Sequence, residues 1–375
     1  MTKGRIGYVD QFRGLATIFM IETHVVNALL LNGLRSYFTF KILDFVNGIV
    51  APSFLFVAGF SFTLALNRKG DAYRRFSGEL WRHIRRLVYI WATGYLMHIP
   101  YFSLYKSVHH ATPQDILSFF GVDILQCIAI TLMILHIFRI IIKDDRFFNW
   151  FLHGLFLLFV LGAPAAGAYD FTRILPAFFA QYFNRLHGSL FPLFPWSSFL
   201  IAGTIVSQKV SFDKENKLRK HITLTGSLLV LSGVALMLLH IRLFPQISAV
   251  DYSTGWFMVR LGFLLWILRG ITWYESKKVR QYSVVKILGR ESFLVYVTHV
   301  LFIYGSSAKH VALVQSIGQT LSYLQCFGIF LLLTTAMFVL AFIWSTLKSR
   351  SYKLSRLVQY TFVSWFLYLF IKNPY

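Results

Sequence analysis

Apolar runs of about 18 residues or more recur along the whole chain, and no other feature constrains its fold as strongly. A helix of that length crosses the hydrocarbon core of a bilayer, where the backbone must satisfy its own hydrogen bonds. Of the 375 residues, 56% are hydrophobic and only 14% are charged, a combination that is rare in soluble domains. We therefore predict an all-α, polytopic integral membrane protein whose residues 1–375 form a single transmembrane domain.

The length of the apolar runs predicts about eleven transmembrane helices. They are expected at 14–32, 45–66, 87–105, 116–138, 147–163, 190–208, 222–244, 255–274, 291–308, 317–346 and 357–371. The sequence shows no internal repeat, and so it gives no support to the inverted-repeat architecture of many transporters. The basic N-terminus resembles a signal peptide, but Arg13, Glu22 and His24 interrupt the apolar run and no small-residue cleavage site follows. We therefore expect a retained first span.

Lysine and arginine concentrate in alternate connections between these spans. The basic segments are those before residue 14 and at 67–86, 139–146, 209–220, 269–290 and 348–356. Positively charged loops stay in the cytoplasm, so the N-terminus is expected inside and the C-terminus outside. These loops account for the formal net charge of +22, and we expect no nucleic-acid partner. Cys127 and Cys326 both lie within spans and are interpreted as packing residues, and no metal site is expected.

The first span carries the polar run MIETHVVN between Met20 and Asn27. His24 lies roughly 15 Å along the helix from Gly14, near the middle of the membrane. Asn27 shares its face, whereas Glu22 points about 200° away. An ionisable group at this depth costs roughly 2.5–3.5 kcal/mol and needs a partner. Two interpretations remain open: His24 is a buried general base or acyl acceptor, or it is a packing histidine bonded to another span.

Small and charged residues at the inner ends of the first two spans predict close helix packing. Asp10 and Arg13 in YVDQFRG can pair on one helical turn, and Gly14 lets another backbone approach closely. In the second span, Pro52 can introduce a kink, and Gly59 suits a close helix crossing.

An arginine cluster stands at the inner end of the third span, in RRFSGELWRHIRRLVYIW. Arg82, Arg85 and Arg86 lie on one side of this helix. Guanidinium groups bind phosphates in bidentate fashion, so the cluster suits a cytosolic phosphorylated cofactor. The alternative is that it sets topology and contacts anionic lipid headgroups.

Two later spans also open with polar residues. Asp123 and Gln126 are one turn apart in GVDILQCIAI at the start of the fourth span. In LGRESFLVYVTHV, Arg290 and Glu291 lie at the inner surface, and His299 is about two turns into the ninth span. Further site candidates are therefore Asp10, Glu22, Gln126, Arg290, Glu291 and His299.

Taken in order, these motifs resemble a known family. RIGYVDQFRGLATIFMIETH, APSFLFVAGFSFTLAL and GVDILQCIAI are similar to the heparan-alpha-glucosaminide N-acetyltransferase catalytic-domain family and, more loosely, to the type-3 membrane acyltransferases. The arginine-x-x-arginine element that opens the third span is here Arg82 to Arg85. LFPLFPWSSFLIAGTIVS and LGRESFLVYVTH are similar to late segments of related membrane proteins. The best-matched core is residues 5–140.

The resemblance implies transfer of an acyl group, by default acetyl, from cytosolic acyl-CoA to a hydroxyl or amine of a glycan or lipid-linked acceptor on the other side. His24 takes the catalytic position of the bacterial and type-3 members, because Leu30 to Arg35 offers no histidine where the lysosomal members carry theirs. Two roles stay open for Asp123, which are to orient this imidazole or to pair with an arginine, and Asn27 is a candidate oxyanion donor. The residues expected to hold the donor's phosphates are Arg13, Arg82, Arg85 and Arg86.

A proton-coupled transporter or flippase is the alternative function, because many spans with buried acids and a midplane histidine suit it as well. Binding of CoA would favour the enzyme. A bacterial inner membrane is the expected location, in contact with membrane lipids, and a homodimer is left open. The sequence does not distinguish direct transfer from an acyl-histidine intermediate.

Overall fold

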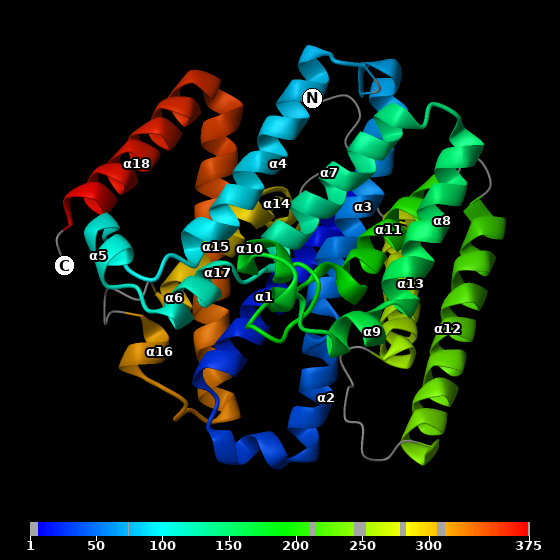
Figure 1. Ribbon diagram of the computed structural model, residues 1–375, viewed down its shortest axis with the longest axis horizontal. Helices are drawn as coiled ribbons and strands as arrows, with labels where there is room; N and C mark the ends of the chain where they lie inside the picture. Colours follow the sequence, from blue (N-terminus) through cyan, green and yellow to red (C-terminus); the bar gives the residue numbers. More distant parts are fainter. Residues whose placement is uncertain are drawn as a thin grey trace. The chain divides into compact units, whose positions relative to one another are not determined.

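The computed structural model describes residues 7–73, 75–209, 215–243, 253–277, 283–305 and 312–373. Several predicted inner cations, among them Arg74 and those at 1–6, 210–214 and 278–282, lie outside the described residues. The described part is helical, with an isolated bridge between Leu30 and Leu321 as its one β-type pairing (Figure 1). The all-α prediction is therefore confirmed.

Every predicted span corresponds to a helix. The helices are α1 (Gly7–Leu29), α3 (Val50–Lys69), α4 (Gly78–Met97), α7 (Ile124–Ile141), α8 (Asp145–Leu161), α11 (Leu193–Lys209), α12 (Glu215–Leu243), α13 (Thr254–Lys277), α15 (Ser292–Tyr304), α17 (Tyr323–Arg350) and α18 (Tyr352–Lys372). By length and apolarity, 6 spans among the described residues qualify to cross a membrane, or up to 7 with one bent pair. With 17 residues each, α8 and α11 are shorter than a usual membrane-spanning helix. The count of eleven and the orientation stay predictions.

Shorter helices connect these elements. They are α2 (Phe38–Asn47), α5 (Leu104–His109), α6 (Pro113–Phe119), α9 (Ala163–Ala168), α10 (Ala177–Ala180), α14 (Val284–Arg290) and α16 (Leu313–Ser316), with 3-10 turns η1 (Asn32–Ser36), η2 (Gly70–Tyr73) and η3 (Phe171–Arg173).

The chain divides into two compact units. The first combines Met1–Val50, Met97–Phe119 and Tyr274–Tyr375, and the second contains Ala51–Leu96 and Phe120–Trp273. Both ends of the chain therefore contribute to the first unit, and the middle of the chain forms most of the second.

In the first unit, α1 packs against α14, α15 and α17. The crossing of α1 and α14 is close because a glycine stands on each side. A β-carbon on Gly14 would lie 1.9 Å from the carbonyl oxygen of Val285, and one on Gly289 would lie 2.0 Å from that of Asp10. The expected close backbone approach at Gly14 is confirmed.

A sharp bend separates α14 from α15. The two helices meet at 83°, and Glu291 stands between them. The predicted ninth span therefore begins at this bend, and its helix α15 has only 13 residues. The carboxylate of Glu291 accepts a hydrogen bond from Lys348 Nζ of α17 at 2.6 Å, which ties the bend to the neighbouring helix.

In the second unit, α11 packs against α7 and α8 and also crosses α3 closely. A β-carbon on Gly59 would lie 1.8 Å from the carbonyl oxygen of Leu200, and one on Gly203 would lie 1.9 Å from that of Phe56. The prediction that Gly59 serves close packing is confirmed. Pro52 lies in the first turn of α3, where its missing N–H breaks no helical hydrogen bond.

The long connection between α8 and α11 in the second unit is built from α9, η3 and α10. His187 Nε2 donates to Asp170 Oδ1 at 2.8 Å, and the Thr172 hydroxyl donates to the same oxygen at 2.7 Å. The hydrogen bond from His187 and then those from Thr172 lower the pKa of Asp170 to about 2. These contacts join η3 to the end of the connection 17 residues later in the chain.

Candidate functional site

His24 and His299 lie side by side in the first unit. Their ring centroids are 5.1 Å apart and the rings meet edge to face at 81°. The centroid of the Tyr304 ring also lies 5.6 Å from that of His24, edge to face, and the Tyr304 hydroxyl donates to the His24 carbonyl at 3.4 Å. The helix α1 supplies His24 and α15 supplies the other two. Sequence reasoning named both histidines but had no local signal that would pair them.

The hydrogen bonds of the two rings are incomplete. His299 Nδ1 is 2.6 Å from the carbonyl oxygen of Val295, which only accepts, so this nitrogen carries the proton. His299 Nε2 and His24 Nδ1 are both buried and have no hydrogen-bond partner among the described residues. His299 is fully buried, whereas His24 is half-buried. Buried polar atoms of this kind call for an explanation, such as an unseen water or a catalytic role.

Glu22 has different neighbours from His24, as the helical angle between them predicts. Its carboxylate is hydrogen-bonded to the Asn47 side chain at the end of α2, while Glu22 Oε2 is buried without a partner among the described residues. The Glu22 side chain therefore takes part in the contact between α1 and α2.

Asn27 is exposed, although it lies one turn beyond His24. Its backbone carbonyl accepts from Arg35 at 2.9 Å and from Gln319 at 3.4 Å. These bonds join the end of α1 to η1 and to the chain before α17. An oxyanion role for the Asn27 side chain stays a prediction.

The charged candidates near the N-terminus of α1 connect helices. Arg290 Nε donates to Asp10 Oδ2 at 3.1 Å, which links α14 to α1. The Arg13 carbonyl accepts from the Thr17 hydroxyl at 2.8 Å, and the Arg13 side chain is half-buried. Together with the Glu291–Lys348 pair, these contacts fix three helices around the start of the first span.

Asp123 and Gln126 form the N-terminal cap of α7 in the second unit. Asp123 Oδ1 accepts from the backbone N–H of Ile124 at 2.7 Å, and Gln126 Oε1 accepts from the Asp123 N–H at 3.2 Å. This is a capping box, which satisfies the orphan donors at the helix start. The structure thus gives the Asp123 carboxylate a structural use, and its predicted role as orienter is untested.

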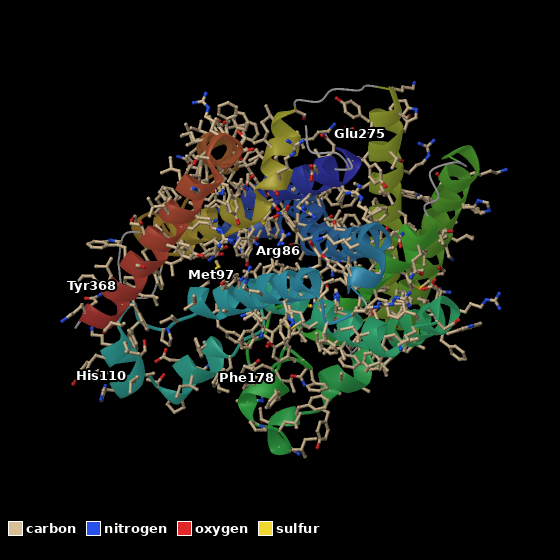
Figure 2. All side chains as sticks on the ribbon, turned by 90° about the horizontal axis from the view of Figure 1, so that it is seen from above. Arg86, Met97, His110, Phe178, Glu275 and Tyr368 are labelled. Atoms are coloured by element: carbon tan, nitrogen blue, oxygen red, sulfur yellow. The ribbon has the colours of Figure 1, made fainter. Side chains whose placement is uncertain are left out.

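The arginines at the start of α4 are exposed to solvent or lipid (Figure 2 marks Arg86). Arg82 forms an ion pair with Glu79, and so does Lys69. The hydrogen bond from Lys69, with the nearby positive charges, lowers the pKa of Glu79. Arg85 and Arg86 complete the cluster, which can reach a phosphate of a ligand or of a lipid headgroup.

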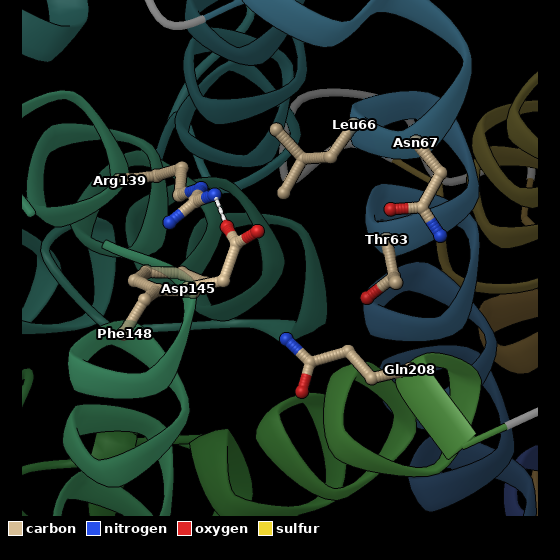
Figure 3. Close-up of a pocket in the computed structure, with 7 residues that line it drawn as sticks. All are labelled: Thr63, Leu66, Asn67, Arg139, Asp145, Phe148 and Gln208. Atoms are coloured by element: carbon tan, nitrogen blue, oxygen red, sulfur yellow. Dashed lines mark hydrogen bonds and ion pairs between the residues drawn. The ribbon is translucent and has the colours of Figure 1, made fainter. Parts of the chain in front are cut away.

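A cavity of about 270 Å³ lies at the ends of α3, α7, α8 and α11 (Figure 3). It is lined by Thr63, Leu66, Asn67, Arg139, Asp145, Phe148 and Gln208. Arg139 is buried, forms an ion pair with Asp145, donates to the Ile142 carbonyl at 3.2 Å and packs 4.8 Å from the centre of the Phe148 ring. Because Asp145 already neutralises Arg139, the cavity is not an open anion site. Sequence reasoning missed this pair.

The sequence profile of the heparan-alpha-glucosaminide N-acetyltransferase catalytic domain matches residues 5–241. The chain belongs to this family. A comparison with curated proteins finds no matching relative. Membership of this family indicates that the protein is a membrane acetyltransferase. The family also implies acetyl-CoA as the acetyl donor. His24 lies inside the matched region, whereas His299 and Tyr304 lie beyond it.

No group of three or more His, Cys, Asp or Glu in the described part of the chain is placed to hold a metal ion. The chemistry available near His24 is that of imidazole, phenol and backbone groups.

Proposed function

We propose that this N-acetyltransferase family member moves an acetyl group from cytosolic acetyl-CoA to a hydroxyl or amine of a glycan or other acceptor on the extracytoplasmic side, with His24 as the reacting imidazole. The observation that carries the proposal is the contact of half-buried His24 with His299 and Tyr304 inside a helical membrane protein of this family. At the mid-membrane depth expected for His24, an imidazole whose Nδ1 has no partner among the described residues is costly as mere packing, so a functional use is favoured.

The donor would enter from the side of the basic loops. Arg85 and Arg86, which are exposed, would bind its phosphates, and Arg82 would join them by exchanging Glu79 for phosphate. The thioester would have to reach His24, which lies roughly 15 Å along the helix from Gly14. Arg13 at the inner end of α1 is a further candidate for the phosphates.

At His24 two routes agree with the residues present. In direct transfer, the imidazole takes the proton of the acceptor, the acceptor attacks the thioester carbonyl, and the proton passes to the departing thiolate. In the second route, an imidazole nitrogen carries the acetyl group between donor and acceptor.

The test is transfer of radiolabelled acetyl from acetyl-CoA in proteoliposomes that hold the purified protein and a panel of amine and sugar acceptors. Wild type should label an acceptor, and His24→Ala should fold but fail to do so. Full transfer by the His24→Ala variant would remove His24 from the reaction.

One feature favours the transporter alternative, namely the bent pair α14–α15, because broken helices line the substrate sites of many transporters. Uptake of labelled solute into the same vesicles without acetyl-CoA would support that function. Specific binding of CoA with no uptake would support the enzyme.

A further inference from the structure

A catalytic imidazole works best in one tautomer, which the hydrogen bond on its second ring nitrogen selects. The carboxylate nearest to His24 in sequence is Glu22, which bonds Asn47, and Asp123 caps α7 in the other unit. Two rings meet His24 edge to face, those of His299 and Tyr304, and the Tyr304 hydroxyl donates to the His24 backbone carbonyl. An orienter for His24 is therefore best sought in a neutral side chain.

The unpaired atoms of the two rings are complementary. The Val295 carbonyl fixes the proton of His299 on Nδ1, so that Nε2 of the neutral ring bears a lone pair and accepts. His24 Nδ1 is buried on the adjacent ring and also lacks a partner among the described residues. One hydrogen bond between these atoms would satisfy both. The ring centroids are 5.1 Å apart, a separation at which such a bond forms once the two rings turn these atoms toward each other.

We propose that His299 is the positioning residue of His24: its Nε2 accepts the Nδ1–H of His24 and leaves the lone pair of His24 Nε2 free for the reaction. Two successive hydrogen bonds, from His24 to His299 and from His299 to the Val295 carbonyl, would then orient the imidazole as a carboxylate does in a hydrolase triad. Its catalytic meaning rests on the proposed function. Because His299 is fully buried and His24 is half-buried, His299 acts through His24 and not on the substrate.

A second histidine suits this depth better than an acid, because a neutral ring adds no charge to the membrane. In direct transfer, His24 Nε2 takes the proton of the acceptor, and the bond from Nδ1–H to His299 stabilises the positive ring. The new bond forms between the acceptor atom and the acetyl carbon, the carbon–sulfur bond breaks, and the proton moves from His24 to the thiolate. Catalytic hydrogen bonds are often long before substrate binds, which agrees with the unpaired atoms seen here.

The competing explanation is that His299 only packs. A packing histidine is present for comparison: His153 Nδ1 in α8 lies 2.7 Å from the Asn149 carbonyl, the same bond to the preceding turn. His153→Phe is therefore the matched control for His299→Phe, because each change removes one imidazole and one bond of this kind.

The test reads the tautomer of His24 directly. Protein with ¹⁵N-labelled histidine rings is placed in lipid nanodiscs, and its imidazole nitrogens are observed by NMR, with His24→Asn identifying the His24 signals. We expect the Nδ1–H tautomer in wild type and in His153→Phe, and its loss in His299→Phe. His299→Gln should retain part of it, because the Gln oxygen can accept near the position of Nε2.

The proposal is overturned if His24 carries its proton on Nε2 in wild type, or if His299→Phe leaves the His24 signals unchanged. The first result needs no variant of His299 and so decides the matter even if His299→Phe does not fold. Neither NMR result requires the protein to be catalytically active. The His299 proposal can therefore fail while acetyl transfer is found, and it can hold while no acetyl transfer is found.

Once an acceptor is known, kinetics separate positioning from packing. His299→Phe should lower kcat by roughly 10²- to 10⁴-fold with KM little changed, His299→Gln should lower it less, and His153→Phe should not lower it. A loss confined to the amount of folded protein, with kcat per folded molecule unchanged, would leave His299 as a packing residue and refute the proposal.

Discussion

Asp10 and Arg290 are 280 positions apart in the sequence, yet their side chains meet at 3.1 Å between the first turn of α1 and the last residue of α14. The carboxylate is almost fully buried, and the guanidinium is about a third exposed. Removing one partner leaves the other charge uncompensated, which costs more than the pair itself contributes.

For this pair we predict that Asp10→Asn and Arg290→Gln each destabilise the protein by about 1–3 kcal/mol. The double variant should lose less than the sum of the two single losses, as residues in direct contact do. Thermal unfolding of the four proteins in one detergent measures this coupling. Additive losses would show that the two side chains do not interact.

Gly14 and Gly289 should tolerate no β-carbon. Alanine at either position would press on a backbone carbonyl at 1.9 or 2.0 Å, so α1 and α14 would have to separate. We expect a loss of about 1–3 kcal/mol or more in each variant. Gly328→Ala in α17 is the control, because a β-carbon there meets nothing within 4 Å, and it should be neutral or slightly stabilising. Equal melting temperatures for all three variants would contradict this prediction.

The Asp170–His187 contact should make the connection between α8 and α11 sensitive to acid. The pKa of Asp170 is lowered to about 2 from 3.8 in the folded chain, so its contribution is complete above pH 4 and is lost as the pH falls toward 2. Asp170→Asn should therefore melt below wild type at pH 5, and the gap should shrink by pH 2.5. If the difference in melting temperature between wild type and Asp170→Asn does not change with pH, the ionised Asp170 carboxylate is not what stabilises the connection.

Glu22→Gln should leave acetyl transfer nearly intact, because Glu22 bonds Asn47 and a glutamine amide can replace that bond. Glu22→Ala should lower the melting temperature by leaving Asn47 unpaired. Activity of both variants is measured per folded molecule in the proteoliposome assay. A large loss of kcat in Glu22→Gln would place the carboxylate in the reaction.

Arg85→Ala and Arg86→Ala should weaken CoA binding about tenfold each, the value of one charge-assisted hydrogen bond. Titration calorimetry with CoA and with CoA lacking the 3′-phosphate shows which arginine meets which phosphate. Arg350→Ala, at the exposed end of α17, is the control for loss of a basic residue. Unchanged affinity for CoA in both test variants would show that the arginine cluster sets membrane topology or contacts lipid headgroups and does not bind the donor.

Much of the fold follows from local pattern. The length and apolarity of the runs place a helix at every predicted span, and helical angles correctly separate the neighbours of Glu22 from those of His24. Gly14 and Gly59 indicate close helix crossings because a residue without a side chain lets another backbone approach at that position.

The bend and the histidine pair could not be predicted in the same way. No proline marks the break before Ser292, which coincides with the packing of Gly289 on α1 and the bond from Lys348 to Glu291. His24 and His299 lie in segments that are far apart in sequence, and their contact depends on how α1 and α15 pack. A single sequence does not show how these helices pack, so it cannot identify side-chain partners such as Asp123 for His24.

The first unit draws its helices from both ends of the chain, and this has a consequence for biosynthesis. A ribosome adds about 5–20 residues per second, so α1 enters the membrane tens of seconds before α14 and α15 exist. During that interval His24 is without the ring that faces it in the finished protein, and the glycine face of α1 is uncovered. A chain interrupted after residue 241 would hold the whole family-matched region and still lack this half of the histidine pair.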